Sequence, residues 1–521
     1  MRIEMKDFAR NSSIYFISNL INKGISFFLF AYIARAITVE QMGQYNLYLL
    51  LATIFTLFLS LEIQSGYTRF YFDMKRAGKR DAFEHSLINL LLLANIILGI
   101  LFWISRDTIF GIFYNIPDAT YLLIIFFPFF TSVSSIILAK FRLEERAFEL
   151  AVVSLLQNLA NLVFVISLLS AMSDKVFIII CGMLIMHGVI IFYYAVRYIR
   201  SWSFRIDFSL VKESLRFSSF LCVSTMGAYF LSMTDRYMLE KLETEKSVGY
   251  YSAFSRLAST VELCMLPFYN AFAPKVYREY QREGFRKVYY SMLIMVSAIL
   301  LLQTNFLTLF NKELTTLILS SKYIDYYYVL YILVLGYAFK SMSYYLAMNI
   351  HLSKKTQYDI VVEVSSGIIN ILLNILLIIQ IGLIGAVIAT VISYFIRLTM
   401  YLFYANRFFK RFYLSYVKIG SFIAALLSFT WFHYTLFEQD LPIKIGIYLL
   451  ELFAVVFIFL RVVDNRYREI LLTKLKSIPT SLSFHGRWTN LSSNKETDDD
   501  SSSDKERQST KRDRTPTGRI G

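Results

Sequence analysis

Long runs of apolar residues, separated by short polar connections, extend over most of the chain. Each run is close to 20 residues, the length that a helix needs to cross a bilayer core of roughly 30 Å. Strands of a membrane barrel would instead alternate apolar and polar positions over about ten residues. The pattern therefore predicts an all-α polytopic membrane protein with fourteen spans: residues 14–37, 42–67, 85–104, 118–139, 149–170, 176–196, 214–235, 248–272, 288–310, 326–351, 358–380, 383–405, 418–435 and 445–463.

Composition agrees with this prediction. Of 521 residues, 56% are hydrophobic and 17% are charged, and the mean hydropathy is +0.51. Water-soluble domains carry about 25% charged residues. The composition excludes an ordinary soluble protein.

Basic residues gather in alternate connections between the spans. The connections on one predicted side hold 25 Lys and Arg residues, and those on the other side hold 8. Cytoplasmic loops of membrane proteins carry such an excess. We therefore predict that both termini face the cytoplasm, and we interpret the net charge of +15 as membrane orientation and not as nucleic-acid binding.

A short internal repeat indicates two halves. An Arg closes the first span, and Glu40 precedes Gly43 and Tyr45 at the start of the second; the seventh span has Arg236, followed by Glu245, Gly249 and Tyr251. Transporters are commonly built from two such halves. We predict an N-lobe of six helices at 1–200, a C-lobe of six at 201–410, two extra helices at 411–463, and a largely disordered cytoplasmic tail at 464–521.

Motifs of catalysis and metal binding are absent from the sequence. It contains no phosphate-binding loop, no His-Glu-x-x-His and no Gly-x-Ser-x-Gly. The five histidines and three cysteines lack metal-ligand spacing. We therefore expect no enzyme activity, no cofactor and no metal site.

Polar residues fall at three- and four-residue steps on several spans, which places them on one face of each helix. Such stripes predict a common polar interior. The stripes include Asn19, Asn22, Lys23 and Ser26 on span 1; Ser252, Ser255, Arg256 and Ser259 on span 8; Tyr337, Lys340 and Tyr344 on span 10; and Glu363, Asn370 and Asn374 on span 11.

Charged residues in the middle of spans are costly, so they face a cavity or a partner. Lys23, Arg256 and Lys340 are the central cations, and the central acids are Glu262, Glu363 and Glu451. One interpretation is pairing between helices, and Glu451 fits this best. The other is a cationic cavity for an anionic substrate, with Glu262 or Glu363 coupling transport to an ion. Nearer the span ends, we expect snorkelling to headgroups for Arg35, Arg69, Asp235, Arg236 and Arg397.

Three blocks of sequence resemble the polysaccharide flippases of the multidrug/oligosaccharidyl-lipid/polysaccharide exporter superfamily. They are the stretch from Asn11 to Phe72; Thr234 to Leu239 followed by Val248 to Ser252; and Ser353 to Thr356 followed by Asn370, Asn374 and Gly382 to Tyr394.

This resemblance implies two six-helix lobes, as in multidrug and toxin extrusion (MATE) transporters, and alternating access in the cytoplasmic (inner) membrane. The implied substrate is an undecaprenyl-diphosphate-linked oligosaccharide, a repeat unit of O-antigen, capsule or exopolysaccharide. Coupling to a proton or sodium ion and contacts with polysaccharide assembly proteins are implied as well. Cationic residues on the first, second and eighth helices would be Lys23, Arg35, Arg69 and Arg256.

Two alternatives stay open at this point. A cation-coupled exporter of small cationic drugs would share the fold, but it would require an acidic cavity. A membrane glycosyl-transfer or polymerase enzyme would require an outer catalytic domain, and the longest outward connection, 311–325, is too short for one.

Overall fold

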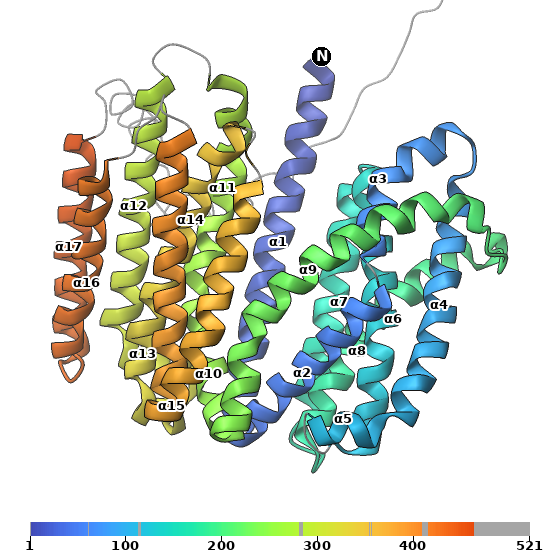
Figure 1. Ribbon diagram of the computed structural model, residues 1–521, viewed down its shortest axis with the longest axis horizontal. Helices are drawn as coiled ribbons and strands as arrows, with labels where there is room; N and C mark the ends of the chain where they lie inside the picture. Colours follow the sequence, from blue (N-terminus) through green and yellow to red (C-terminus); the bar gives the residue numbers. More distant parts are fainter. Residues whose placement is uncertain are drawn as a thin grey trace, which may run out of the picture. The chain divides into compact units, whose positions relative to one another are not determined.

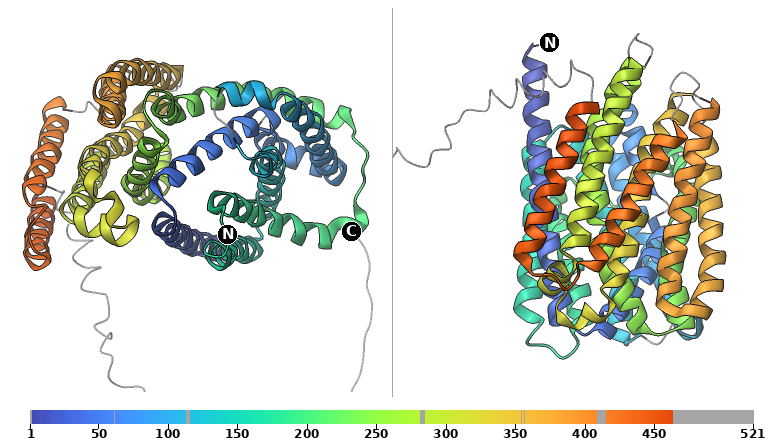
Figure 2. Two further views of the ribbon diagram at one scale, coloured as in Figure 1. Left: turned by 90° about the horizontal axis from the view of Figure 1, so that it is seen from below. Right: turned by 90° about the vertical axis from the view of Figure 1, so that its left-hand side faces the viewer.

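A computed structural model describes residues 2–60, 62–112, 116–280, 285–353, 355, 357–408 and 415–462. Within these ranges the regular structure is helical throughout, without strands. The predicted cytoplasmic tail lies outside the described residues. The long helices run side by side, and α1 begins at the same end of the bundle at which α17 ends (Figures 1 and 2).

Six spans form the N-lobe (Figure 1). The second span bends between α2 and α3, where Glu62 has a φ of 54°. The helices are α1 (Arg2–Ala36), α2 (Val39–Ser60) with α3 (Ile63–Arg76), α4 (Arg80–Ile104), the short α5 (Arg106–Ile112), α6 (Asp118–Leu143), α7 (Ala147–Leu168) and α8 (Lys175–Tyr198).

Six further spans form the C-lobe, and two more pack beside it. The helices are α9 (Phe208–Leu242), α10 (Glu245–Ala258) with α11 (Thr260–Glu279), α12 (Phe285–Leu309), α14 (Tyr328–Leu352), α15 (Gln357–Phe408), α16 (Tyr416–Thr435) and α17 (Leu441–Val462). Between α12 and α14 lie the short elements α13 (Asn311–Leu314), η2 (Thr315–Leu319) and η3 (Ser321–Tyr326). The extra helices α16 and α17 pack on α12.

Each of the fourteen predicted spans corresponds to a helical segment. Ten helices of the described residues are long and apolar enough to cross a membrane by length and composition alone. One of them, α15, holds two predicted spans, because Gly382 at φ 59° breaks the helix between them. The remaining three spans are α9, α10 with α11, and α16, which carry more polar residues. The chain is a multi-pass membrane protein.

Helix α9 connects the two lobes. Its first half packs on the N-lobe, where Gly66 of α3 lies against the hydroxyls of Ser214 and Ser218. Val211 joins the apolar core of that lobe. Its second half packs on α15 and α10, and Leu239 is buried there. A single helix is therefore anchored in both lobes.

The lobes also meet directly where α2 and α10 begin, at the end predicted to face outward. A Cβ atom on Gly43 would overlap the backbone of Glu245, and one on Gly249 would overlap the backbone of Val39. Gln44 Nε2 donates a hydrogen bond to Glu245 Oε2 at 2.9 Å. The two copies of the predicted repeat thus contact each other reciprocally, because glycine allows the helix backbones to approach closely.

A second contact between the lobes involves the end of α1, whose last carbonyls have no partner within the helix. Lys175 Nζ, from α8 of the same lobe, donates to Ala36 O at 2.7 Å. Lys322, from η3 of the C-lobe, donates to Arg35 O at 3.3 Å and also to Ile37 O. Burial lowers the pKa of Lys322, and the Lys175 ammonium adds to this effect. Ammonium groups from both lobes therefore cap one helix end.

The crossing of α2 and α10 leads to a prediction about Gly249. Gly249→Val should separate the two helices, because the new side chain has no space beside Val39. The readout is crosslinking of a Glu40→Cys, Lys246→Cys pair by a short thiol reagent, since the native side chains lie 3.7 Å apart at Nζ and Oε1. The yield should fall several-fold. Gly420→Val is the matched control, because no atom lies within 4 Å of a Cβ at that position; an unchanged yield in Gly249→Val would contradict the prediction.

Candidate functional site

A cavity of about 390 Å³ lies between the lobes. Helices α1, α2, α7 and α8 contribute its N-lobe wall, and α9, α10 and α14 contribute its C-lobe wall. Parts of the polar stripes on spans 1, 8 and 10 reach this cavity. Their residues in the cavity wall are Ser26, Ser252, Ser255, Arg256, Ser259 and Tyr337.

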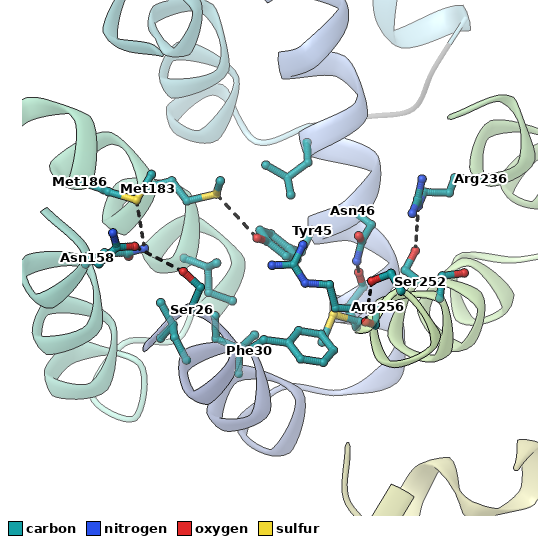
Figure 3. Close-up of a pocket in the computed structure, with 18 of the residues that line it drawn as sticks. Ser26, Phe30, Tyr45, Asn46, Asn158, Met183, Met186, Arg236, Ser252 and Arg256 are labelled. Carbon is teal, nitrogen blue, oxygen red and sulfur yellow. Dashed lines mark hydrogen bonds between the residues drawn. The ribbon is translucent and has the colours of Figure 1, made fainter. Parts of the chain in front are cut away.

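Two arginines give the C-lobe wall its charge (Figure 3). Arg236 Nε donates to Ser252 Oγ at 3.2 Å, and its guanidinium lies 5.9 Å from the ring centroid of Tyr251. The Arg256 guanidinium is exposed and lies 5.9 Å from the ring centroid of Phe30. Ser259 Oγ donates to the carbonyl of Arg256 at 2.8 Å. We expected Arg236 to snorkel to headgroups, but it lines the cavity, because α9 continues to Leu242 and places it within the helix.

The opposite wall carries no charge among the described residues, and its polar groups lie between apolar side chains of α1, α2 and α8. Ser26 Oγ on α1 donates to Asn158 Oδ1 on α7 at 3.3 Å, and Asn158 Nδ2 donates to Asn22 Oδ1 at 3.2 Å. Asn46 and Asn161 add two more amides. Of the residues predicted for the polar interior, Ser26 lies in this wall, and Asn22 supports it through Asn158. Asn46, Asn158 and Asn161 were not predicted, although each is an amide within an otherwise apolar run.

Lys340 belongs to an ion pair. Its Nζ lies 2.9 Å from Glu262 Oε2, and Tyr344 Oη donates to Glu262 Oε1 at 2.8 Å. The side chains of Lys340 and Glu262 are about one quarter exposed, at 24% and 25%. The pairing interpretation therefore holds for this Lys and this Glu.

Glu363 is paired as well, with Arg397. Arg397 donates to Glu363 Oε1 through Nε at 3.0 Å and through Nη2 at 2.6 Å, and to Ser343 Oγ at 2.6 Å. Tyr401 Oη adds a hydrogen bond to the same carboxylate. Our expectation that Arg397 snorkels is wrong: the residue is buried, since its partner on the neighbouring half of α15 holds it inside the lobe.

Asp235 departs most from expectation. We predicted a snorkelling carboxylate, but the residue is only 5% exposed. Asn374 Nδ2 donates to Oδ1 at 2.5 Å, and Tyr251 and Thr390 donate to Oδ2 at 2.6 and 3.1 Å. Asn374 also donates to Asn370 at 3.0 Å. We call Asp235, Tyr251, Asn370, Asn374 and Thr390 the Asp235 cluster. Asn370 and Asn374, expected in the cavity wall, lie in this cluster.

The remaining predicted residues lie elsewhere. Asn19 and Lys23 are exposed on α1 and are not among the residues that line the cavity. Arg35 is exposed at the outer contact and donates to Thr316 O at 3.5 Å. Arg69 pairs with Asp73 at 3.2 Å on the surface of α3. Of the five predicted cations, the cavity wall contains Arg256.

Two buried networks stabilise the lobes themselves. Glu451 accepts hydrogen bonds from Asn305 at 3.0 Å and contacts His433 Nε2 at 2.7 Å, which confirms its predicted structural role. In the N-lobe, Lys140 Nζ lies 2.9 Å from Glu84 Oε1, and both are buried. The pair of Lys140 and Glu84 was not predicted, because both residues were assigned to cytoplasmic connections. Within the described part of the chain, no group of three His, Cys, Asp or Glu side chains could hold a metal ion.

Solved structures share this fold. The structure matches lipid II flippase MurJ in an inward closed conformation with a TM-score of 0.67 and 17% identity, covering 86% of this chain and 98% of that one. It matches an inward-facing MATE family multidrug resistance transporter of the MOP superfamily with a TM-score of 0.55 and 14% identity, covering 74% and 94%. The fold is therefore that of the MOP superfamily, with two six-helix lobes and two extra helices.

Sequence comparison identifies relatives in glycan synthesis. The chain is 22% identical over 205 residues to a protein of Haloferax volcanii described as probable low-salt glycan biosynthesis flippase Agl15. This match covers 39% of the chain and 43% of that relative, less than half of either. The sequence profile of the polysaccharide biosynthesis protein family matches residues 8–278, more than half of the chain. The chain therefore belongs to the polysaccharide biosynthesis protein family.

Proposed function

We propose that this protein is a flippase that moves an undecaprenyl-diphosphate-linked oligosaccharide across the cytoplasmic membrane by alternating access. The observation that carries the proposal is the cavity between the lobes, which is lined by Arg236 and Arg256 and by no carboxylate among the described residues. Arginine suits phosphate because its planar fork donates several hydrogen bonds and stays charged. The descriptions of Agl15 and MurJ as flippases support the same conclusion.

The positive charge of the cavity lining favours the flippase proposal over export of cationic drugs. A small cationic drug entering the cavity would meet two guanidinium groups, and no carboxylate lines the cavity among the described residues. Repulsion between like charges is strong where water is scarce. The cavity therefore favours an anionic substrate over a cationic one.

Alternating access requires the lobes to separate at one end while they meet at the other. Apart from α9, the extensive contacts between the lobes in the described residues are those of α2 with α10 and of α1 with η2. Both lie at the end predicted to face outward. We propose that this arrangement is the state that receives substrate from the cytoplasmic side, and that opening the Gly43 and Gly249 crossing releases it outside.

We propose that ion coupling involves Asp235 and not Glu262 or Glu363. The latter two acids are neutralised by Lys340 and Arg397. In contrast, the hydrogen-bond partners of Asp235 among the described residues are neutral, and buried Asn374 Oδ1 has no partner there. A buried carboxylate whose hydrogen bonds come from neutral donors is costly in a membrane, even with the Arg236 guanidinium near it. A proton would neutralise it directly, and a sodium ion could bind its oxygen together with those of Asn374 and Thr390, since hard cations prefer oxygen ligands.

Transport in reconstituted vesicles tests the cavity. With a fluorescent undecaprenyl-diphosphate-linked sugar, Arg236→Gln, Arg256→Gln should lower the rate at least tenfold, because a hydrogen bond to a charged group contributes about 1.5–3 kcal/mol and each 1.4 kcal/mol is about a factor of ten. Lys312→Gln is the control, because Lys312 pairs with Glu438 on the outer connection.

Two results would count against this assignment. If the wild-type protein leaves the leaflet distribution of the probe unchanged, the proposed function is wrong. If the double variant transports at the wild-type rate, the cavity is not the route of the diphosphate.

The coupling proposal has its own test. In the same vesicles, a sodium gradient at constant pH and a pH gradient at constant sodium are applied separately. We expect one of them to accelerate transport in the wild-type protein and in Glu262→Gln, and neither to accelerate it in Asp235→Asn, whose side chain cannot bind the cation as a carboxylate. A gradient response that persists in Asp235→Asn would exclude Asp235 as the coupling group.

A further inference from the structure

The two walls of the cavity differ in chemistry in a way that would orient a substrate. The C-lobe wall carries the guanidinium groups of Arg236 and Arg256, and the N-lobe wall carries the amides of Asn46 and Asn158 (Figure 3). Asn161 adds a third amide to the N-lobe wall. A lipid-linked sugar has the same division, with charge on its diphosphate and neutral hydrogen-bonding groups on its sugar. Its head group therefore complements the cavity in one orientation.

Resting on the proposed function, we propose that the diphosphate binds the C-lobe wall and that the N-lobe wall binds the first sugar, which is an uncharged sugar such as an N-acetylhexosamine. The three asparagines form what we call the amide wall. They are then the residues that determine specificity for the first sugar.

The amide wall is held in position before substrate arrives. Asn158 Nδ2 donates to Ser154 O at 2.8 Å and to Asn22 Oδ1 at 3.2 Å, which uses both of its hydrogens. Its Oδ1 accepts from Ser26 and retains a second lone pair for a hydroxyl donor. Because the bonds come from both α1 and α7, this side chain has little freedom to lose on binding.

The other two amides have unused hydrogen-bonding capacity. Asn46 Nδ2 donates to Met42 O at 2.7 Å, which leaves its second hydrogen and its Oδ1 without a partner among the described residues. Asn161 Oδ1 has no partner there and is buried against Gly182 of α8, whereas Asn161 Nδ2 contacts only the sulfur of Met186, at 4.0 Å, and keeps its donor capacity. Buried polar groups are normally hydrogen-bonded, so such a group calls for a partner. Hydroxyl and acetamido groups of a sugar donate and accept at once, which matches these amides.

The positive charge of the cavity lining also restricts which class of sugar can bind. The cavity lining contains two guanidinium groups and no carboxylate among the described residues. A free amino sugar would bring an ammonium next to them and would need a counterion that the wall does not offer. An acetylated amine has no charge and keeps its hydrogen-bonding groups.

Binding measurements on the full-length protein in nanodiscs test the orientation. The probes are undecaprenyl diphosphate, undecaprenyl-diphosphate N-acetylglucosamine and undecaprenyl-diphosphate glucosamine. We expect the N-acetylglucosamine probe to bind the wild-type protein at least fivefold more tightly than the sugar-free probe, and the glucosamine probe to show no such gain. Asn46→Leu and Asn161→Leu should each reduce the gain while leaving affinity for the sugar-free probe unchanged.

Two further variants complete the comparison. Arg256→Gln should weaken both the sugar-free and the N-acetylglucosamine probe by the same factor, about tenfold, and so keep the gain. Asn19→Leu is the matched control, since it removes an amide from an exposed position of α1 that is not part of the lining, and it should bind like the wild-type protein.

The outcomes separate this inference from the proposed function. If the wild-type protein binds none of the probes, both fail. If it binds the sugar-free probe but shows no gain from N-acetylglucosamine, or if the amide variants weaken both probes equally, the flippase proposal stands and the amide wall is overturned as the sugar site. An equal gain from glucosamine would overturn the assigned class of sugar.

Discussion

The cost of placing charge in a medium without water governs this structure. Each of the three central acids identified from the sequence has a partner on another helix or helix segment: Lys340 for Glu262, Arg397 for Glu363, and His433 for Glu451. Glu84 and Lys140 do the same in the N-lobe. Breaking a buried pair leaves one charge uncompensated, which costs about 3–5 kcal/mol. These pairs therefore hold helices together, and the proposed function rests on charged groups that face the cavity or accept hydrogen bonds from neutral donors.

Three further charged groups lie where the two lobes meet. Arg236 and Arg256 face the cavity, and Asp235 accepts hydrogen bonds from neutral donors of α10 and α15. All three belong to α9 and α10, and α9 is the helix that packs on both lobes. The same region contains the glycine crossing that joins α10 to α2. Binding at these residues thus acts on the elements that determine how the lobes approach each other.

The arrangement of spans could be predicted from sequence because it depends on local quantities. Hydrophobic length identified all fourteen spans, and even the break at Gly382 within α15 fell between two predicted segments. Polar residues at helical spacing include Ser26, Ser252 and Arg256, which line the cavity in the structure. Each of these inferences needs only the residues of a single helix.

The partners of charged residues could not be predicted in this way, because pairing depends on which helices are neighbours. Lys340 and Glu262 are 78 positions apart, and neither span contains a sequence signal that identifies the other as its neighbour. Asp235 illustrates a second difficulty. The predicted span ended at residue 235, so the carboxylate seemed free to reach the headgroups, whereas α9 continues to Leu242 and places it nearly two turns inside the helix. An error of seven residues in a boundary therefore changed the interpretation of the group.

The positions of Asp235 and Arg236 provide a physical route for coupling. Consecutive residues of a helix point about 100° apart, so the two side chains leave α9 in different directions. Asp235 meets Tyr251 inside the C-lobe, and Arg236 meets Ser252, the next residue of α10, at the cavity. A cation that neutralises Asp235 and an anion that binds Arg236 would therefore act on neighbouring residues of the same two helices. Both helices continue to the contact between the lobes. Binding of either ligand could therefore shift α9 and α10, and this shift would change the site of the other ligand.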